Sequence, residues 1–132
     1  MSIRKRLATF GLGALISLGI TGTSSAGELT IYAGAEADNI KYFSEVFQKA
    51  HPDIKLNWIR DSTGIIAARV LAEKDNPKAD VLFAMAVTSM TSFARMGMFE
   101  PYNPAGLEKL NPLFLDTQKP ANWVGLYGWA SS

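Results

Sequence analysis

The sequence predicts an α/β fold, in which helices flank a mostly parallel sheet. A strand-like run is followed by a helical pattern three times between residues 28 and 96. The third strand-like run, residues 81–84, is apolar throughout, which is typical of a strand that helices cover on both faces. Such alternation favours a parallel sheet, because a helix usually connects one parallel strand to the next.

The first strand is predicted over residues 28–33, which are rich in β-branched and aromatic side chains. A helix follows it, with Asp38 as the N-cap. This helix ends at His51, because the residue before Pro52 disfavours the α conformation. Its apolar face is predicted to consist of Ile40, Phe43, Val46, Phe47 and Ala50.

The second and third strands are each followed by a helix as well. Residues 54–59 place an apolar side chain at every second position, the pattern of a half-buried strand at the edge of a sheet. The segment 61–64 (Asp-Ser-Thr-Gly) then opens a helix over residues 65–74. The third strand leads into a helix over residues 88–96, which Gly97 ends as the C-cap.

The chain beyond Phe99 contains four prolines and is predicted to be rich in loops. A further strand is predicted over residues 124–130. Because this apolar strand lies so close to Ser132, we expect the chain to be the front part of a larger protein.

The first 26 residues have the pattern of a secretory signal peptide. Basic residues at positions 4–6 precede an uncharged apolar stretch over residues 7–20, and small residues lead to an expected cleavage between Ala26 and Gly27. As a helix, the apolar stretch is about 21 Å long, which is short of the roughly 30 Å of a hydrocarbon core. We therefore expect export with cleavage of the signal peptide.

Composition narrows the possible functions. The chain has 13 basic residues, and without the three of the signal peptide ten remain against 12 acidic residues, so the net charge of about −2 favours no nucleic-acid partner. The absence of cysteine excludes a disulfide framework, a thiolate metal site and a cysteine nucleophile. No nucleophile elbow, phosphate-binding Gly-Lys-Ser/Thr loop or cluster of metal ligands occurs in the sequence. We predict no catalytic residue, no metal and no cofactor.

Three loops follow the carboxyl ends of the predicted strands and are therefore expected to meet at one edge of the sheet. In open parallel α/β sheets, ligands bind at this edge. These loops are residues 34–36, 61–64 and 86–89. A helix start offers unpaired N–H groups and the positive end of the helix dipole to an anion. The predicted ligand-binding residues are Glu36, Ser62, Thr63, Gly64, Thr88 and Ser89.

Several of these residues also have a simpler structural interpretation. Serine and threonine are common N-caps, so capping alone would explain Ser62 or Thr88. Glu36 is either a solvated loop carboxylate or the group that meets the ammonium of a ligand. Met85 is expected in the core, and His51, the only histidine, is expected to complement the dipole at a helix end.

Several segments resemble periplasmic solute-binding proteins of ABC importers with the type II fold. Within that group they resemble the 2-aminoethylphosphonate-binding branch, which is related to ferric-iron-binding proteins. The segments are residues 29–33, 61–66, 72–77, 79–81, 97–102 and 123–125. The resemblance implies a monomeric periplasmic receptor that captures a small phosphonate-like anion and delivers it to an ABC permease in the inner membrane. It also implies that residues 27–132 are part of the N-terminal lobe, with residues 124–130 as the first hinge strand.

The resemblance assigns Ser62, Thr63 and Thr88 to the site that binds the oxyanion of the ligand. The iron-binding relatives carry a metal ligand in the first loop and a carboxylate after the third strand, positions that fall on Glu36 and Met85 here. Because a thioether is a poor ligand for a hard ferric ion, Met85 argues against iron. Since complete receptors close two lobes around the ligand, we expect residues 27–132 alone to bind it weakly or not at all.

Other interpretations stay open on the sequence alone. A receptor of the same fold for ferric iron, a polyamine or a sulfate-like solute is the nearest alternative. An exported α/β hydrolase is another, with Ser62 or Thr88 attacking the substrate and the remaining catalytic residues beyond Ser132. A third is a gene remnant without function.

Overall fold

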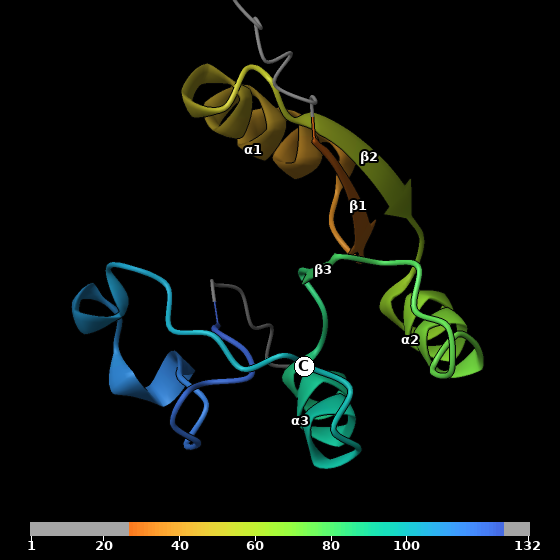
Figure 1. Ribbon diagram of the computed structural model, residues 1–132, viewed down its shortest axis with the longest axis vertical. Coiled ribbons are helices and arrows are strands. Elements are labelled where there is room, and N and C mark those ends of the chain that lie inside the picture. Colours follow the sequence, from red (N-terminus) through yellow and green to blue (C-terminus); the bar gives the residue numbers. More distant parts are fainter. Residues whose placement is uncertain (1–26, 126–132) are drawn as a thin grey trace, which may run out of the picture.

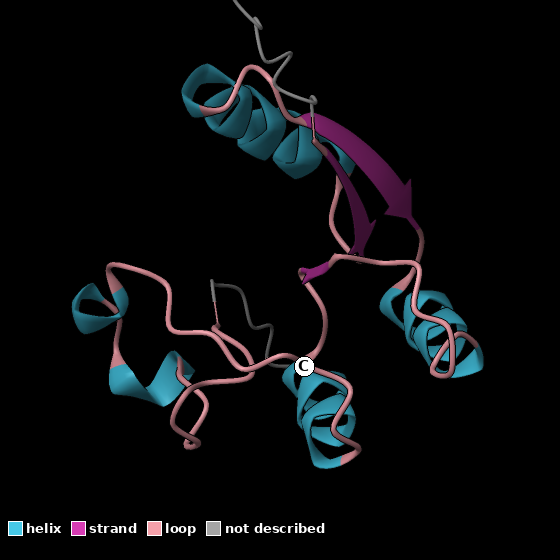
Figure 2. Ribbon diagram, viewed as in Figure 1, coloured by secondary structure: helices cyan, strands magenta, loops and turns pink. Residues whose placement is uncertain are grey.

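A computed structural model describes residues 27–125, which form a three-stranded parallel sheet with helices on both sides (Figure 1). Figure 2 shows that regular structure dominates the first three quarters of this part and loops the rest. The strands are β1 (Glu28–Ala33), β2 (Lys55–Arg60) and β3 (Val81–Phe83), and the helices are α1 (Ala37–Ala50), α2 (Thr63–Ala72) and α3 (Val87–Arg95). The predicted α/β fold with a parallel sheet is confirmed.

The order of the strands is β2-β1-β3, so β1 lies in the centre and β2 lies at an edge, as predicted. Ile31 of β1 lies opposite both Trp58 of β2 and Val81 of β3. Because alternate side chains of a strand point to opposite faces, these three residues share one face of the sheet. Tyr32 points to the other face.

Each face of the sheet is covered by a different helix. On the first face, the ring of Phe43 from α1 packs edge-on against Phe83, with ring centroids 5.0 Å apart. On the second face, the hydroxyl of Tyr32 donates to Oε2 of Glu73, at the end of α2, over 2.8 Å. The guanidinium of Arg69 lies 4.7 Å from the centroid of the Tyr32 ring. This arrangement buries Tyr32 completely.

The buried centre of the sheet is β1 and not β3. Ile31, Tyr32 and Ala33 of β1 are buried, whereas Val81 of β3 is 41% exposed. The prediction that residues 81–84 form a strand covered on both faces is therefore wrong for the part of the chain that the structure describes. The physical reason is that β3 lies at the edge of this sheet and pairs there with β1 alone.

All three helices begin earlier than the sequence predicts. Helix α2 covers Thr63–Ala72, whereas the sequence predicts residues 65–74. Helix α1 starts at Ala37 with Glu36 as its N-cap, because the Glu36 carbonyl already accepts a hydrogen bond from the amide of Ile40 over 3.1 Å. Asp38 is therefore not the cap but lies in the first turn, where a carboxylate complements the helix dipole. Helix α3 starts at Val87 and ends, as predicted, next to Gly97.

The end of α3 is a Schellman motif. Gly97 has a φ of 67°, in the left-handed region that favours glycine. Its amide donates to the carbonyl of Ala94 over 3.0 Å, and the amide of Met98 donates to that of Phe93 over 3.1 Å. These two hydrogen bonds satisfy carbonyls that the helix itself leaves unpaired.

The last described part, residues 101–125, is rich in loops, as predicted, with two short 3₁₀ turns at Leu107–Lys109 and Pro112–Phe114. Of the strand predicted over residues 124–130, only the first two residues are described, and Val124 pairs with Leu115 in an isolated antiparallel bridge. Residues 126–130 and the predicted signal peptide lie outside the described residues. Between residues 27 and 125, no helix is long and apolar enough to cross a membrane.

Candidate functional site

The three loops that follow the strands meet around Gly34. The amide of Gly34 donates to the carbonyl of Phe83 over 3.1 Å, and the amide of Asp61 donates to that of Ala33 over 3.2 Å. A Cβ atom at Gly34 would collide with the methyl group of Thr63 and would lie 2.9 Å from the Ala84 carbonyl oxygen. Glycine is therefore required here for close packing, and the expectation that these loops come together at one edge is confirmed.

A cavity of about 720 Å³ lies at this edge of the sheet. Its wall combines the three loops with part of the segment 113–125. Glu36 is the only charged residue among the described residues that line it. Representative lining residues are Gly34, Glu36, Thr63, Met85, Phe114 and Trp123. The wall is thus mainly apolar, with a few polar groups, as is usual for sites that bind small molecules.

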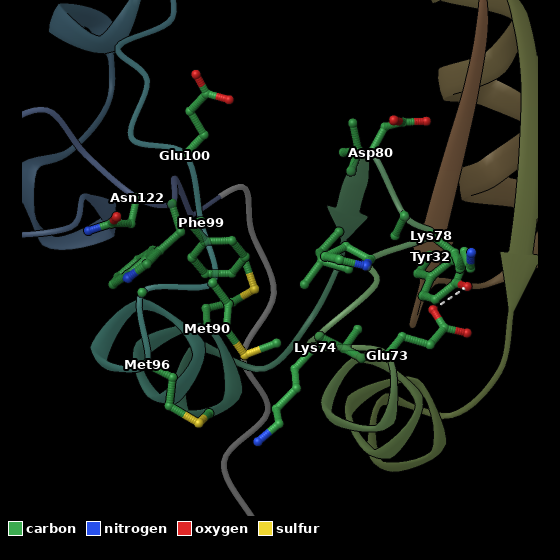
Figure 3. A pocket seen from close by; sticks show the side chains of 18 of the residues that line it. Tyr32, Glu73, Lys74, Lys78, Asp80, Met90, Met96, Phe99, Glu100 and Asn122 are labelled. Carbon is green, nitrogen blue, oxygen red and sulfur yellow. Dashed lines mark hydrogen bonds between the residues drawn. The ribbon is translucent and has the colours of Figure 1, made fainter.

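A larger cavity, about 920 Å³, lies between α2, β3 and α3 (Figure 3). In Figure 3, Tyr32 and Glu73 form one side, and Met90 and Phe99 lie across from them. Asp80, which precedes β3, also lines this cavity, so the cavity extends to the amino end of β3. We place the candidate site in the smaller cavity, because ligands of parallel sheets bind beyond the carboxyl ends of the strands.

The structure brings two of the six predicted site residues to the wall of the smaller cavity. These residues are Glu36 and Thr63. Ser62 is not on the wall; it is the N-cap of α2, and its Oγ accepts a hydrogen bond from the amide of Ile65 over 3.4 Å. Gly64 follows in the first turn of α2, with open space where a Cβ atom would lie.

The other two predicted residues, Thr88 and Ser89, lie in the first turn of α3 and also away from the cavity wall. Neither of them caps the helix. The N-cap is Ala86, whose side chain makes no capping hydrogen bond. Residues 84–87 therefore line the cavity at the start of α3, whereas Thr88 and Ser89 follow directly in the first turn and do not line it.

Glu36 is held by a side chain that the sequence analysis did not single out. Although Glu36 is the N-cap of α1, its carboxylate makes no capping hydrogen bond. Instead, Oε2 accepts a charged hydrogen bond from Nη2 of Arg60 over 3.3 Å. Nε of the same guanidinium donates to the carbonyl of Ala35 over 2.8 Å. Arg60 thus fastens two successive residues of the first loop to the end of β2.

For two residues on the cavity wall, the structure shows a backbone conformation or a degree of burial that the sequence did not predict. Ala84 has a φ of 54°, which is uncommon for a residue with a Cβ atom. Met85, which was expected in the core, is only partly buried and lines the cavity. Its position directly after the third strand is a signal that could have assigned it to the site, because the carboxyl ends of parallel strands face the ligand.

The resolved pKa shifts lie outside this cavity. Burial of Tyr32 and its hydrogen bond to Glu73 raise the pKa of the tyrosine hydroxyl. The same hydrogen bond, together with Arg69, lowers the pKa of the Glu73 carboxyl. Partial burial acts to raise the pKa of Asp116, but hydrogen bonds from Asn122 and neighbouring backbone amides outweigh it and lower that pKa. These groups are structural contacts, remote from the candidate site.

The described residues offer few groups that could bind a metal ion. No group of three or more His, Asp or Glu side chains that could hold a metal ion occurs within residues 27–125. At the cavity wall, the donor set of Glu36 and Met85 combines one carboxylate with a thioether. A hard cation such as ferric iron prefers several oxygen ligands, so this wall alone is unsuited to it.

Comparison with known proteins gives relatives that are much longer than this chain. No protein-family model matches it. The chain is 31% identical over 117 residues to an uncharacterized protein of Haemophilus influenzae, a match that covers 86% of this chain and 33% of that protein. It is 31% identical over 93 residues to a probable ABC transporter periplasmic-binding protein of Sinorhizobium fredii, with 70% and 25% covered. The matches therefore span a third or less of each relative.

Three solved structures of binding proteins are similar to the described fold. The periplasmic binding protein P5PA has a TM-score of 0.60 and 26% identity, over 67% of this chain and 28% of that one. AfuA from Actinobacillus pleuropneumoniae, solved with fructose-6-phosphate bound, has a TM-score of 0.62 and 29% identity, over 68% and 28%. Iron-bound HitA from Pseudomonas aeruginosa has a TM-score of 0.62 and 22% identity, over 69% and 29%, and supports the fold alone. These similarities confirm the predicted fold class, the type II-like fold of periplasmic binding proteins.

Proposed function

We propose that this chain is the solute-binding component of an ABC importer, or part of one. In this role it would capture a small solute in the periplasm and deliver it to a permease in the inner membrane. The observation that carries the proposal is the cavity where the loops after β1, β2 and β3 meet, in a fold shared with periplasmic binding proteins. The named relative, a probable ABC transporter periplasmic-binding protein, supports the same role.

The proposed mechanism is reversible binding, without the making or breaking of a covalent bond. The first amides of a helix have no partner within the helix, so the start of α2 offers N–H groups to an anion. Ser62, as the N-cap, fixes that start, and Thr63 adds a hydroxyl at the cavity wall. We assign the oxyanion of the solute to this corner. Gly64, Thr88 and Ser89, which the sequence also predicts to bind it, do not line the described wall, so the corner is built from the start of α2 and Thr63.

For the solute itself, we propose a small phosphonate with an amino group, such as 2-aminoethylphosphonate. Glu36 supplies the single carboxylate of the described wall, which suits an ammonium group. The helix starts suit the phosphonate. AfuA, a neighbour of this fold, was solved with a phosphate-bearing ligand, which supports an anion of this class. Met85 on the wall offers a thioether, which is a poor ligand for ferric iron, and this argues against iron.

Two further expectations belong to the same proposal. We propose that the chain acts as a monomer, and that residues 27–132 are part of the N-terminal lobe of a receptor. The hydrolase alternative has no support in the comparisons, because every relative with a named role is a binding protein.

The test is a titration of the isotope-labelled chain, followed by NMR so that weak binding is detected. We expect 2-aminoethylphosphonate at millimolar concentration to shift the amide signals of Glu36 and Thr63, and ferric citrate to leave them unchanged. Thr63→Val should weaken the response, because it removes the hydroxyl but keeps the shape of the side chain. Thr91→Val, at a partly buried position of α3 away from the wall, is the matched control. A response to iron alone would contradict the proposed solute.

A further inference from the structure

Arg60 connects the end of β2 to the first loop of the candidate site. Its Nε and Nη2 bind the carbonyl of Ala35 and the carboxylate of Glu36, over 2.8 and 3.3 Å. A guanidinium is planar and presents its donors in a fixed fork, so the two hydrogen bonds together fix the position of both residues. The contact is long-range, because Arg60 lies 24 residues after Glu36 in the sequence.

The side chains of the first loop, residues 34–36, do little by themselves to hold it in place. Glu36 does not use its side chain to cap α1, and Gly34 has no side chain with which to hold the loop. Ala35 is buried, and its carbonyl accepts the hydrogen bond of Arg60 in a partly buried position. Loss of this donor would leave a partly buried acceptor unpaired, which is unfavourable. Among the described residues, Arg60 therefore contributes two side-chain hydrogen bonds that hold the loop in place.

The ion pair between Arg60 and Glu36 adds little stability by itself. The side chain of Glu36 is 85% exposed and that of Arg60 is 49% exposed, and exposed pairs are weak. Its effect is on geometry: one carboxylate oxygen of Glu36 is held by Arg60, which keeps the charge at the cavity wall. Without Arg60, the carboxylate would be free to turn into solvent.

We propose that Arg60 is a positioning residue of the candidate site, which fixes the loop between β1 and α1 and holds the Glu36 carboxylate where a cationic group of the solute is recognised. The proposal that Arg60 positions the loop depends only on the contacts of Arg60. The recognition of a cationic group rests on the proposed function. The two parts therefore have separate measurements.

The first measurement is amide hydrogen exchange of the full chain without ligand. We expect Arg60→Gln to raise the exchange rate of the amide of Ile40, which donates to the Glu36 carbonyl, by at least about tenfold, while the amides of β1 and β2 keep theirs. Arg60→Lys should restore only part of the protection, since an ammonium cannot hold both partners. The matched control is Lys55→Gln, which breaks the exposed ion pair of Lys55 with Glu28 (3.2 Å) at the other end of the same strands. Unchanged exchange in Arg60→Gln, or equal loosening of the loop in Lys55→Gln, would overturn the positioning role.

The second measurement compares 2-aminoethylphosphonate with methylphosphonate, which lacks the amino group, by NMR titration. We expect the unaltered chain to prefer the amino compound, and both Arg60→Gln and Glu36→Gln to lose that preference while binding of methylphosphonate is kept. A preference that persists in Arg60→Gln would overturn the recognition role. If neither compound binds the unaltered chain but the loop loosens in Arg60→Gln, the proposed function fails and the positioning of the loop stands.

Discussion

Helices α2 and α3 both begin at the candidate site, but they are held there by different means. The start of α2 is capped by the side chain of Ser62, and its end is fastened by Glu73, which accepts the hydrogen bond of buried Tyr32. Helix α3 has no side-chain cap at Ala86, and its end is closed by backbone hydrogen bonds around Gly97. Polar side chains therefore fix both ends of α2, a local one at its start and a distant one at its end, whereas α3 depends on packing and backbone geometry.

The difference shows which part of the site is encoded locally. The start of α2 follows from a serine in the N-cap position, a signal that is visible in the sequence. No capping side chain marks the start of α3, and the loop before it lies close to Gly34, which precedes Ala84 by 50 positions. Substitutions at these positions should separate the two mechanisms, and we order them by the size of the expected effect.

The largest effect is expected at Phe93, the buried anchor of α3. Phe93 is 1% exposed and packs edge-on against Phe99. Phe93→Ala should lower the free energy of unfolding by about 3–5 kcal/mol, measured by denaturant titration, because it leaves a cavity. Val87→Ala, at an exposed position of the same helix, is the control and should change it by less than about 0.5 kcal/mol. Similar losses in both variants would show that packing at Phe93 is not what holds α3.

The second largest effect is expected at Gly34, where both helix starts meet. Gly34→Ala would force a Cβ atom against Thr63 and the Ala84 carbonyl, and should lower the free energy of unfolding by roughly 1–3 kcal/mol. Gly64→Ala is the matched control, because nothing lies near its Cβ position, and it should gain up to about 1 kcal/mol in helix propensity. Thermal unfolding of the two variants compares them directly. A neutral Gly34→Ala would mean that the loops are not tightly packed there.

A third pair of substitutions removes the serine cap from α2 and places one at the start of α3. Ser62→Ala removes the cap of α2 and should cost about 1 kcal/mol. Ala86→Ser should gain a similar amount at α3, because Ala86 (φ −61°, ψ 137°) has nearly the backbone conformation of Ser62 (φ −59°, ψ 149°). Urea unfolding provides the measurement. If Ala86→Ser gains nothing, the loop before α3 rather than the missing cap limits its stability.

Ala84→Gly should have a smaller effect and should be stabilising. The left-handed conformation costs an alanine about 1–2 kcal/mol, and the greater freedom of glycine in the unfolded chain offsets about 0.5–1 kcal/mol of that cost. A net gain of about 0.5 kcal/mol is expected, with the melting temperature as the measurement. A decrease in melting temperature would show that the methyl group of Ala84 makes contacts worth more than the strain.

The smallest effect is a dependence of α2 on pH that α3 should not share. The pKa of Glu73 is lower in the folded chain, so its contribution is present above its unfolded pKa and is lost as the pH falls through the folded one. The pKa of Tyr32 is raised, so its contribution is complete below about pH 10 and is lost as the pH rises further. We expect the protection of the α2 amides, relative to the intrinsic exchange rate at each pH, to fall at both extremes.

The control for this pH effect is Glu73→Gln, which should remove the acidic part of the response of α2. Asp116 also has a lowered pKa, so acid is expected to loosen residues 116–122 in both chains. Only the difference between the two chains therefore reports on Glu73. An acid response of α2 that persists in Glu73→Gln would show that other carboxyl groups cause it.

The sequence was sufficient to predict the strands and helices, because their hydrophobic periods differ. It did not predict which strand is central: the apolar run of β3 indicated burial, but a strand's place in the sheet depends on pairing with distant segments. The starts of all three helices lie one or two residues before the predicted ones. At α1 and α3, preferred capping residues stand near the start, but the backbone hydrogen bonds begin earlier.

The candidate site was predictable where topology alone determines position. Glu36 and Thr63 follow the ends of β1 and β2, so a parallel sheet brings them to one edge. Arg60 was missed because a charged residue at the end of an edge strand resembles an ordinary surface residue. Its bonds to Ala35 and Glu36 become visible only when β1 and β2 are paired.

The strand order also has a consequence for how the protein forms during synthesis. The central strand β1 is made first, and its partners follow it: Glu28 contacts Lys55, 27 residues later, and Thr30 bonds Asp80, 50 residues later. A nascent chain that emerges from its amino end can therefore add β2 and then β3 to a strand that is already present. Each pairing closes a longer stretch of chain than the one before, and long closures slow folding. The sheet would thus assemble outward from β1, in the order in which the strands follow one another along the chain.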